Sequence, residues 1–379
     1  MSTSATALPP RLGSFALVRL LAQGGMADIY LAHQDGLDRD VAVKVLNAER
    51  ACDPEARSLF RDEARVLAML SHANLASVYD VACEAGLHYL VMEYVRGVDL
   101  RELMQTVDVV DYPTAVAIVK AAAAGLDHAH RRCGPDGKPM HLVHRDVSLS
   151  NIMITYEGAV KVVDFGIARA TVSSHHTNPG VVRGKASYMS PEQALGDPVD
   201  LRTDVFALGI VLYELTTGRR CFQGSSDFER MLAVVRAEYV GPQTVVPGYP
   251  AALAHVIATA LSIDPAHRFA SAAALIDALE QVAHTEGWST GAPAIARLMA
   301  EVYGSGPRTD TVEITDSEIV DAQAADRAGE GARPASPPTV VLTRRRLAKG
   351  THAETAPDDD QPTRGRRSVP KIFSAQFAA

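Results

Sequence analysis

The pattern of hydrophobic residues changes near residue 95, and no other feature of the sequence constrains the fold as strongly. Before this point, short β-rich runs alternate with Gly and Asp turns around one helical interval, Pro54–Leu70. After it, long helical segments dominate, interrupted by short strands at Ile152–Thr155 and Val160–Val163. We therefore predict a bilobal α+β fold, with a small antiparallel sheet carrying one main helix and a mainly α-helical second lobe. The clearest further strands are Phe15–Leu21, Asp28–Ala32 and Val41–Val45, and the clearest long helices are Thr114–His130 and Val205–Thr217.

These patterns divide the chain into segments. Residues 1–14 form an N-terminal extension, residues 15–94 and 95–284 form the two lobes of one domain, and residues 285–303 form an additional helix. We expect that helix to dock on the core or on a partner, because its apolar residues have helical spacing. Residues 304–379 are rich in Pro, Thr, Asp, Glu and Arg and poor in large apolar residues, so we expect a disordered tail.

Length, charge and cysteine content exclude several classes of protein. With 379 residues and 47% hydrophobic content, the chain can bury a sizeable core, which excludes disorder over its full length. The formal net charge of −8 disfavours a protein that coats nucleic acid. Four scattered cysteines without a CxxC pair indicate neither a disulfide framework nor a structural metal. Because there is also no secretory signal and no apolar run of about 20 residues, we predict a cytoplasmic protein without a membrane span.

A glycine pair and a lysine are the first candidate site residues along the chain. Gly24 and Gly25 lie between two predicted strands, where backbone N–H groups could approach phosphate oxygens, although an ordinary hairpin turn explains the pair equally well. Lys44 lies in an apolar strand, where an unpaired ammonium group is costly, so it requires an anion. Glu63, in the helical interval, is the natural partner.

The most specific motif combines acidic and amide side chains at short spacing. It reads His144-Arg145-Asp146-Val147-Ser148-Leu149-Ser150-Asn151 and is followed, after two short strands, by Asp164-Phe165-Gly166. This spacing suits phosphoryl transfer, which needs metal ions and one carboxylate aimed at the attacking hydroxyl, whereas a lone Asp on a loop would usually be a solvated surface residue. With Lys44 and Glu63 upstream, the chain resembles the eukaryotic-like protein kinases, specifically the bacterial serine/threonine kinases of the Hanks type, over residues 15–282.

The resemblance implies an enzyme of bacterial signalling that uses ATP and Mg²⁺ to phosphorylate Ser and Thr hydroxyls of protein substrates. By this resemblance, Asp146 orients the acceptor hydroxyl and accepts its proton. Lys44, held by Glu63, binds the α and β phosphates, and Asn151 and Asp164 hold Mg²⁺. The other ATP-binding positions that it implies are Ala22, Gly24, Gly25, Ile29, Ala42, Glu93, Val95, Asp99 and Met153. Taken alone, the apolar members of this set, Ile29, Ala42 and Met153, would be interpreted as core residues.

Further downstream, Ser190-Pro191-Glu192 resembles the end of a kinase activation segment. The resemblance implies that Asp204 caps a buried helix and holds the catalytic loop by hydrogen bonds. It also implies a buried pair between Glu192 and Arg268, whose disruption typically costs about 3–5 kcal/mol.

Several positions depart from the family pattern. Ser148 replaces the usual lysine that contacts the γ-phosphate, and Lys185 replaces the threonine that usually follows the activation-segment glycine. We hypothesise that the two are exchanged, so that Lys185 supplies the cation and Ser148 the hydroxyl, and a solvent-exposed Lys185 is the alternative. Ala22 and Ala27 replace two glycines of the phosphate loop. These departures leave a catalytically weak pseudokinase, acting as a nucleotide-binding scaffold, as the alternative function.

Regulation is suggested by Arg145, which precedes the catalytic Asp. Kinases with this arginine tend to clamp a phosphorylated activation loop with a second basic group, here Arg169. Thr177 is our candidate phosphosite, and a solvated loop hydroxyl is the alternative. The additional helix and the tail could bind a partner, and the basic run at residues 344–346 gives no reason to choose nucleic acid.

Overall fold

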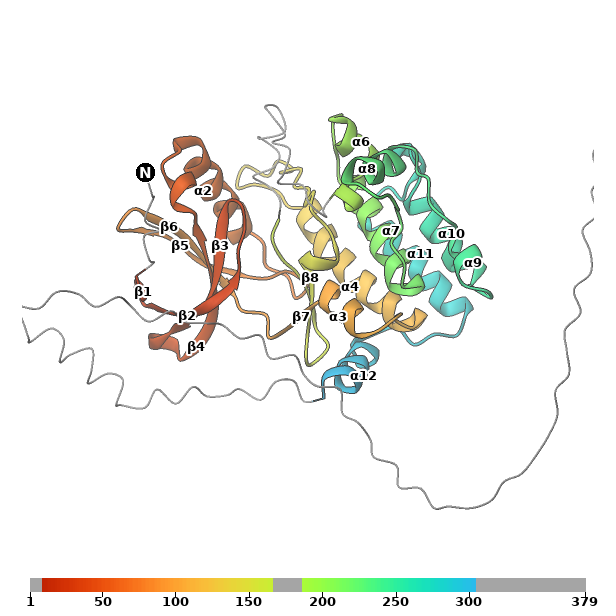
Figure 1. Ribbon diagram of the computed structural model, residues 1–379, viewed down its shortest axis with the longest axis horizontal. Helices are drawn as coiled ribbons and strands as arrows, with labels where there is room; N and C mark the ends of the chain where they lie inside the picture. Colours follow the sequence, from red (N-terminus) through yellow and green to blue (C-terminus); the bar gives the residue numbers. More distant parts are fainter. Residues whose placement is uncertain (1–8, 166–185, 305–379) are drawn as a thin grey trace, which may run out of the picture. The chain divides into compact units, whose positions relative to one another are not determined.

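The computed structural model describes residues 9–165 and 186–304. The chain divides into two compact units, residues 1–310 and 311–379, and every described residue belongs to the first. This unit contains a β-rich N-lobe and a helical C-lobe (Figure 1). The bilobal α+β fold predicted from the sequence is thereby confirmed.

The N-lobe is a six-stranded antiparallel sheet of order β1-β2-β3-β4-β6-β5, with one long helix. Its strands are β1 (Arg11–Leu12), β2 (Phe15–Ala22), β3 (Ala27–Gln34), β4 (Arg39–Leu46), β5 (Val78–Glu84) and β6 (Leu87–Glu93), and its helices are α1 (Ala48–Ala51) and α2 (Pro54–Ala68). A 3₁₀ turn, η1 (Asp35–Leu37), joins β3 to β4.

Strand β4 shows why this sheet has two different faces. Its side chains alternate, so Val41, Val43 and Val45 are buried with Phe15 in a small core on one face. Leu46 lies in the other set and packs with α2 in a second core. Lys44 shares that second face, and it is therefore directed toward α2.

The C-lobe consists of helices around a short three-stranded sheet of order β7-β8-β9. The strands are β7 (Gly97–Asp99), β8 (Ile152–Thr155) and β9 (Val160–Val162). The helices are α3 (Leu100–Thr106), α4 (Tyr112–His130), α6 (Pro191–Leu195), α7 (Arg202–Thr217), α8 (Asp227–Val235), α9 (Pro242–Val245), α10 (Ala251–Ala260), α11 (Ala272–Thr285) and α12 (Ala292–Tyr303). Short 3₁₀ turns are η2 (Leu149–Asn151), η3 (Ala186–Tyr188) and η4 (Pro265–His267).

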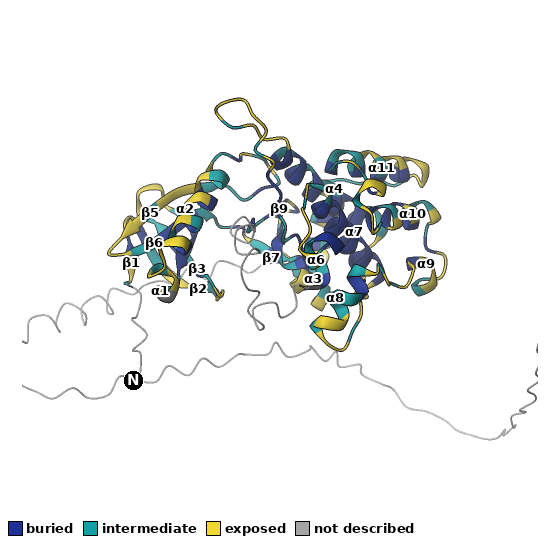
Figure 2. Ribbon diagram, turned by 90° about the horizontal axis from the view of Figure 1, so that it is seen from above, coloured by how far each residue is buried: buried dark blue, intermediate teal, exposed yellow. Residues whose placement is uncertain are grey.

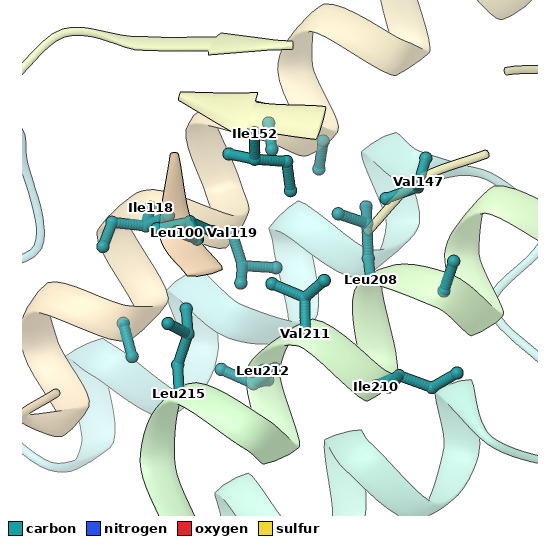
Figure 3. Packing of buried hydrophobic residues seen from close by; sticks show 14 of the residues in the cluster. Leu100, Ile118, Val119, Val147, Ile152, Leu208, Ile210, Val211, Leu212 and Leu215 are labelled. Atoms are coloured by element: carbon teal, nitrogen blue, oxygen red, sulfur yellow. The ribbon is translucent and has the colours of Figure 1, made fainter. Parts of the chain in front are cut away.

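Helix α7 is the centre of the C-lobe core. All its residues from Thr203 to Thr217 are buried, as expected for a helix that is apolar around its whole circumference. Figure 2 shows it as a dark blue helix among neighbours with exposed outer faces. In Figure 3, its Leu208 and Val211 lie against Val119 of α4 and Ile152 of β8. Val147 and Leu149, which follow Asp146 in the chain, belong to the same cluster, so this packing supports the loop that contains Asp146.

The ends of several elements differ from expectation. Residues 11–12, placed in the N-terminal extension, pair with β2, and Leu12 is only 1% exposed. The additional helix begins at Ala292 rather than near residue 285, and it packs on α4 with Ile295 and Met299 buried. Trp288, before this helix, stacks on Tyr112 at a centroid distance of 5.7 Å. The expected tail lies outside the described residues, apart from Gly304.

No described helix combines the length and the apolar character that crossing a bilayer requires.

Candidate active site

Three charged side chains meet between β4, α2 and the segment after β9. The Nζ of Lys44 lies 3.2 Å from Glu63 Oε1 and 3.3 Å from Asp164 Oδ1. Burial alone would lower the pKa of Lys44, but the carboxylates of Asp164 and Glu63 outweigh it, so the pKa is raised. Lys44 therefore stays protonated at neutral pH, and Glu63, the partner predicted from the sequence, is one of its two anions.

Helix α2 directs Glu63 because its apolar side packs on the sheet. Phe60 and Ala64 are buried against Leu46 of β4, and Glu63 on the same side is only 5% exposed. Asp53 begins the helix, since its side chain accepts a hydrogen bond from a backbone N–H of the first turn. The position of Glu63 thus follows from helix packing rather than from its charge alone.

One carboxylate, that of Asp204 in α7, organises the loop that carries Asp146. Its Oδ2 accepts the backbone N–H of His144 at 2.8 Å, and its Oδ1 accepts that of Arg145 at 2.9 Å. The same Oδ2 lies 2.8 Å from His130 Nε2. Burial would raise the pKa of Asp204, but the His130 hydrogen bond and the backbone amides lower it, so the group is an anion. These bonds hold Arg145 at φ +64°, which residues other than glycine rarely adopt.

The side-chain oxygen atoms near Asp146 fit a divalent cation that binds together with a phosphate group. Asn151 Nδ2 donates to the backbone oxygen of Asp146 at 2.7 Å and to its Oδ2 at 2.9 Å. Both amide hydrogens are thereby used, which leaves Asn151 Oδ1 as a metal ligand. Within the described ranges, no cluster of three or more His, Cys, Asp or Glu side chains could hold a metal. A cation held by Asn151 and Asp164 would therefore complete its shell with phosphate and water oxygens, as Mg²⁺ commonly does.

His144 connects the catalytic loop with the segment around Asp164. Its Nε2 lies 3.1 Å from the carbonyl oxygen of Val163, and its ring lies 4.5 Å from that of Phe165. Asp164 has φ +54°, a conformation that needs such support from its neighbours. The two loops therefore hold one another, which keeps Asp146 and Asp164 in one site.

The glycine turn between β2 and β3 is held by local bonds. Gly24 N–H lies 3.2 Å from Asp28 Oδ1, and its carbonyl accepts a hydrogen bond from Asn47 Nδ2 at 2.8 Å. A Cβ at Gly24 would lie 2.6 Å from the carbonyl oxygen of Ala27, so no larger residue fits without rearrangement. Gly25 lies in the same turn, between β2 and β3.

The remaining nucleotide positions expected from the resemblance lie on the sheet and on the segment that joins the lobes. Ile29 is paired with Lys44, Ala42 with Met92, Ala22 with Ile29, and Asp99 with Met153. Val95, in the segment between β6 and β7, is buried, and the Asp99 side chain accepts the N–H of Glu102 and begins α3. These pairings place Ala22, Ile29 and Ala42 on neighbouring strands of the N-lobe sheet, and Asp99 and Met153 on neighbouring strands of the C-lobe sheet.

Residues 15–279 match the family model for the protein kinase domain. The chain belongs to the protein kinase family. It is 37% identical over 309 residues to the tyrosine-protein kinase MasK of Myxococcus xanthus, covering 80% of this chain and 48% of MasK. It is 39% identical over 321 residues to the serine/threonine-protein kinase PknB of Mycobacterium tuberculosis, covering 81% of this chain and 50% of PknB.

Solved kinase structures agree with this assignment. The crystal structure of the Mycobacterium tuberculosis PknI kinase domain superposes with a TM-score of 0.57 at 29% identity, covering 73% of this chain and all of that domain. The serine/threonine-protein kinase PrkC of Bacillus subtilis is 38% identical over 260 residues, covering 69% of this chain and 39% of PrkC. This chain spans about half or less of the length of these three curated relatives. The predicted resemblance to bacterial kinases of the Hanks type is confirmed.

The kinase motif ending in Glu192 is anchored as the sequence predicts. Arg268 Nη1 and Nη2 donate to the two Glu192 carboxylate oxygens, each at 2.7 Å, and Thr203 Oγ1 donates to Oε1 at 2.7 Å. The guanidinium also lies over the Phe206 ring, 4.8 Å from its centroid. Burial would raise the pKa of Glu192, but Arg268 and Thr203 lower it, so the pair is ionised. This ion pair connects α6 with α7 and η4.

Of the residues in the predicted exchange and in the predicted phosphate clamp, only Ser148 and Arg145 lie within the described part of the chain. Ser148 is only 1% exposed, and its Oγ has no hydrogen-bond partner among the described atoms. Lys185, Arg169 and Thr177 lie outside the described residues. The exchange of Ser148 and Lys185 and the phosphate clamp with Arg145 therefore remain predictions.

Sequence reasoning missed one charged pair between the lobes. Lys161 on β9 lies 2.8 Å from Glu93 Oε1, at the end of β6, and 3.0 Å from Oε2. The resemblance implies a role for Glu93 only in ATP binding. The signal was present, because Lys161, like Lys44, lies in an apolar strand where an ammonium group needs an anion.

Proposed function

We propose that this chain is an active protein kinase that transfers the γ-phosphoryl group of ATP to Ser and Thr hydroxyls of proteins. The observation that carries this proposal is the meeting of Lys44 with Glu63 and Asp164, beside a catalytic loop that Asp204 already holds in shape. A scaffold has no need for this arrangement. The membership of residues 15–279 in the kinase family supports the same reaction.

The residues of the site divide the reaction between them. The acceptor oxygen attacks the γ-phosphorus, its proton passes to the Asp146 carboxylate, and the bond to the β-phosphate oxygen breaks to release ADP. Lys44 binds the α and β phosphates, and Glu63 holds Lys44 in place. When bound by Asn151 and Asp164, Mg²⁺ neutralises charge on the phosphates. Asn151 also holds Asp146 through two hydrogen bonds.

The preference for Ser and Thr is part of the proposal. PknB and PrkC are named serine/threonine-protein kinases, whereas MasK is named a tyrosine-protein kinase. The balance of these relatives favours Ser and Thr, and phosphoamino-acid analysis of the product decides between them. We also propose a cytoplasmic location, which the four free cysteines Cys52, Cys83, Cys133 and Cys221 support.

Autophosphorylation with labelled ATP and Mg²⁺ tests the proposed activity. We expect the full chain to incorporate label and Asp146→Asn to lose it by at least about a hundredfold. Asp277→Asn is the matched control, because it makes the same change on an exposed position of α11. Equal labelling of Asp146→Asn and the control would reject a catalytic role for Asp146, and nucleotide binding without label would favour the pseudokinase.

We further propose that Thr177 is the autophosphorylation site and that Arg145 and Arg169 bind its phosphate. Arg145 supports this because its strained backbone is fixed beside the catalytic Asp. Phosphopeptide mapping of the active protein is expected to find phosphate at Thr177. The absence of any phosphate between residues 169 and 184 would contradict it.

A further inference from the structure

A charged cleft lies in the C-lobe close to the catalytic loop and has no part in the reaction described above. Its volume is about 390 Å³, within the range of about 300–1,000 Å³ that ligand sites occupy. The cleft is lined by α3, by the turn after α7, by Leu149 of η2 and by Tyr188 of η3. It is therefore built from four separate parts of the C-lobe.

Three arginines give this cleft its charge. Arg101 belongs to α3, and Arg219 and Arg220 follow α7, and all three are exposed. None of them forms an ion pair with a carboxylate in the part of the chain that the structure describes. Their hydrogen-bond donors therefore lack an anionic partner among the described residues, although a guanidinium group is well suited to bind carboxylates.

The single acidic residue of the cleft does not neutralise these arginines. Glu214 is only 5% exposed, and its oxygens accept the Tyr188 hydroxyl at 2.6 Å and the backbone N–H of Cys221 at 3.1 Å. Arg220 and Arg101 lie near enough to act on Glu214 and on Tyr188 electrostatically. With three cations and one anion, the lining keeps a net positive charge.

The arginines after α7 are held by a turn that requires glycine. Gly218 ends α7 at φ +65°, and a Cβ there would lie 2.2 Å from the carbonyl oxygen of Asp108. The backbone N–H of Val110 also donates to the carbonyl of Leu215, at 2.8 Å, which ties the segment before α4 to the end of α7. The guanidinium groups thus extend from a fixed backbone, so little conformational entropy of the main chain is lost on binding.

The distance to the reaction centre suits a peptide substrate. Leu149 follows Asp146 by three residues, so their Cα atoms are at most about 11 Å apart. An extended peptide covers that distance in about three or four residues. A side chain in the cleft would therefore belong to the same short segment as the hydroxyl that Asp146 serves.

We propose that this arginine cleft binds Asp and Glu side chains of the protein substrate and selects acceptor hydroxyls that have acidic residues within about four positions. This inference rests on the proposed kinase activity and specifies its substrate class. A nucleic acid is disfavoured as the ligand by the position of the cleft beside the protein-phosphorylating loop.

The test uses the full chain with Mg²⁺, ATP and three peptides that share one central Ser. One peptide has Glu at the three preceding positions, one has Glu at the three following positions, and one has Gln at all of them. We expect kcat/KM to be about tenfold higher for one of the Glu peptides than for the Gln peptide, a difference of about 1.4 kcal/mol. Because the contacts are ionic, the preference is expected to shrink as salt rises from 50 to 500 mM, a range chosen to shorten the screening length severalfold.

Variants assign that preference to the cleft. In Arg101→Gln/Arg220→Gln, the ratio of kcat/KM between the Glu and Gln peptides is expected to fall below about threefold. The control, Arg132→Gln/Arg236→Gln, removes two exposed arginines elsewhere in the C-lobe and is expected to keep the ratio. An unchanged ratio in the first variant would show that the preference arises elsewhere and would overturn the inference.

Failure of the inference can be distinguished from failure of the proposed function. Autophosphorylation without any advantage for a Glu peptide would reject the cleft alone, because the reaction would be intact. Loss of all phosphoryl transfer, autophosphorylation included, would reject the proposed function and the inference with it.

Discussion

The carboxylate of Glu93 accepts Lys161 Nζ at 2.8 and 3.0 Å, and its Oε2 also accepts the backbone N–H of Ser77 at 3.1 Å. This pair connects the last strand of the N-lobe with β9 of the C-lobe, and Glu93 is one of the positions that the resemblance implies for ATP binding. The side chains of Glu93 and Lys161 are only 22% and 15% exposed. Their charges are therefore stabilised mainly by each other, and the pair helps to set the spacing of the lobes.

Lys161→Met is expected to destabilise the protein and to weaken ATP binding. It leaves the Glu93 carboxylate without its cation, at a cost of about 1–3 kcal/mol. We expect Tm to fall by at least about 3 °C and KM for ATP to rise, whereas Lys138→Met, at an exposed site, should change neither. A variant with native Tm and KM would show that the pair is incidental.

The Glu192–Arg268 pair predicts a large difference between single and double substitutions. Arg268→Met leaves a buried carboxylate without a partner and is expected to cost about 3–5 kcal/mol in the free energy of unfolding by urea. Glu192→Leu/Arg268→Met removes both charges and is expected to be less destabilised than the single variant. If the double variant were the less stable of the two, the loss would come from packing rather than from the charge.

Asp204 predicts a specific loss of stability in acid. Its pKa is lowered in the folded state, so it binds protons more readily when unfolded, and its contribution is complete above about pH 4 and lost as the pH falls further. We expect the urea unfolding free energy to vary less steeply between pH 4 and 3 in Asp204→Asn than in the native chain. Asp277→Asn serves as the control and should keep the native slope. Equal slopes in all three proteins would mean that Asp204 does not take part in acid unfolding.

The exchange of Ser148 and Lys185 predicts different effects on stability and on activity. Lys185→Ala is expected to lower kcat by about a hundredfold, as the loss of one charge-stabilising donor does, while Lys138→Ala has no effect. Because the Ser148 hydroxyl is buried without a described partner, Ser148→Ala is expected to keep Tm and to lose activity. Near-full activity of Lys185→Ala would rule the exchange out.

Much of the fold can be predicted from local pattern. The strand Ile152–Thr155 and the end of α7 at Thr217 match expectation because buried faces impose periods of two and 3.6 residues on the sequence. Strand β1 could not be found in this way, since two residues are too few to show a period. Helix α12 begins later than expected because Pro293 favours the first turn of a helix and Gly291 lies just before it.

The candidate site was predictable to the extent that a charge in an apolar strand demands a partner. This reasoning found Glu63 for Lys44, and the same reasoning applied to Lys161 would have found Glu93. Arg101 and Arg220 could not be linked from the sequence, because Arg101 lies in α3 and Arg220 follows α7, and only tertiary packing brings them to one cleft.

The bonds from Asp204 to the amides of His144 and Arg145 are made within the protein alone. The reactive loop thus has its working shape before any nucleotide arrives. Little of the affinity for ATP is then consumed in ordering this loop, and more of it is available to position the triphosphate for attack. The site around this loop is therefore preorganised, and the reactants do not have to order the loop when they bind.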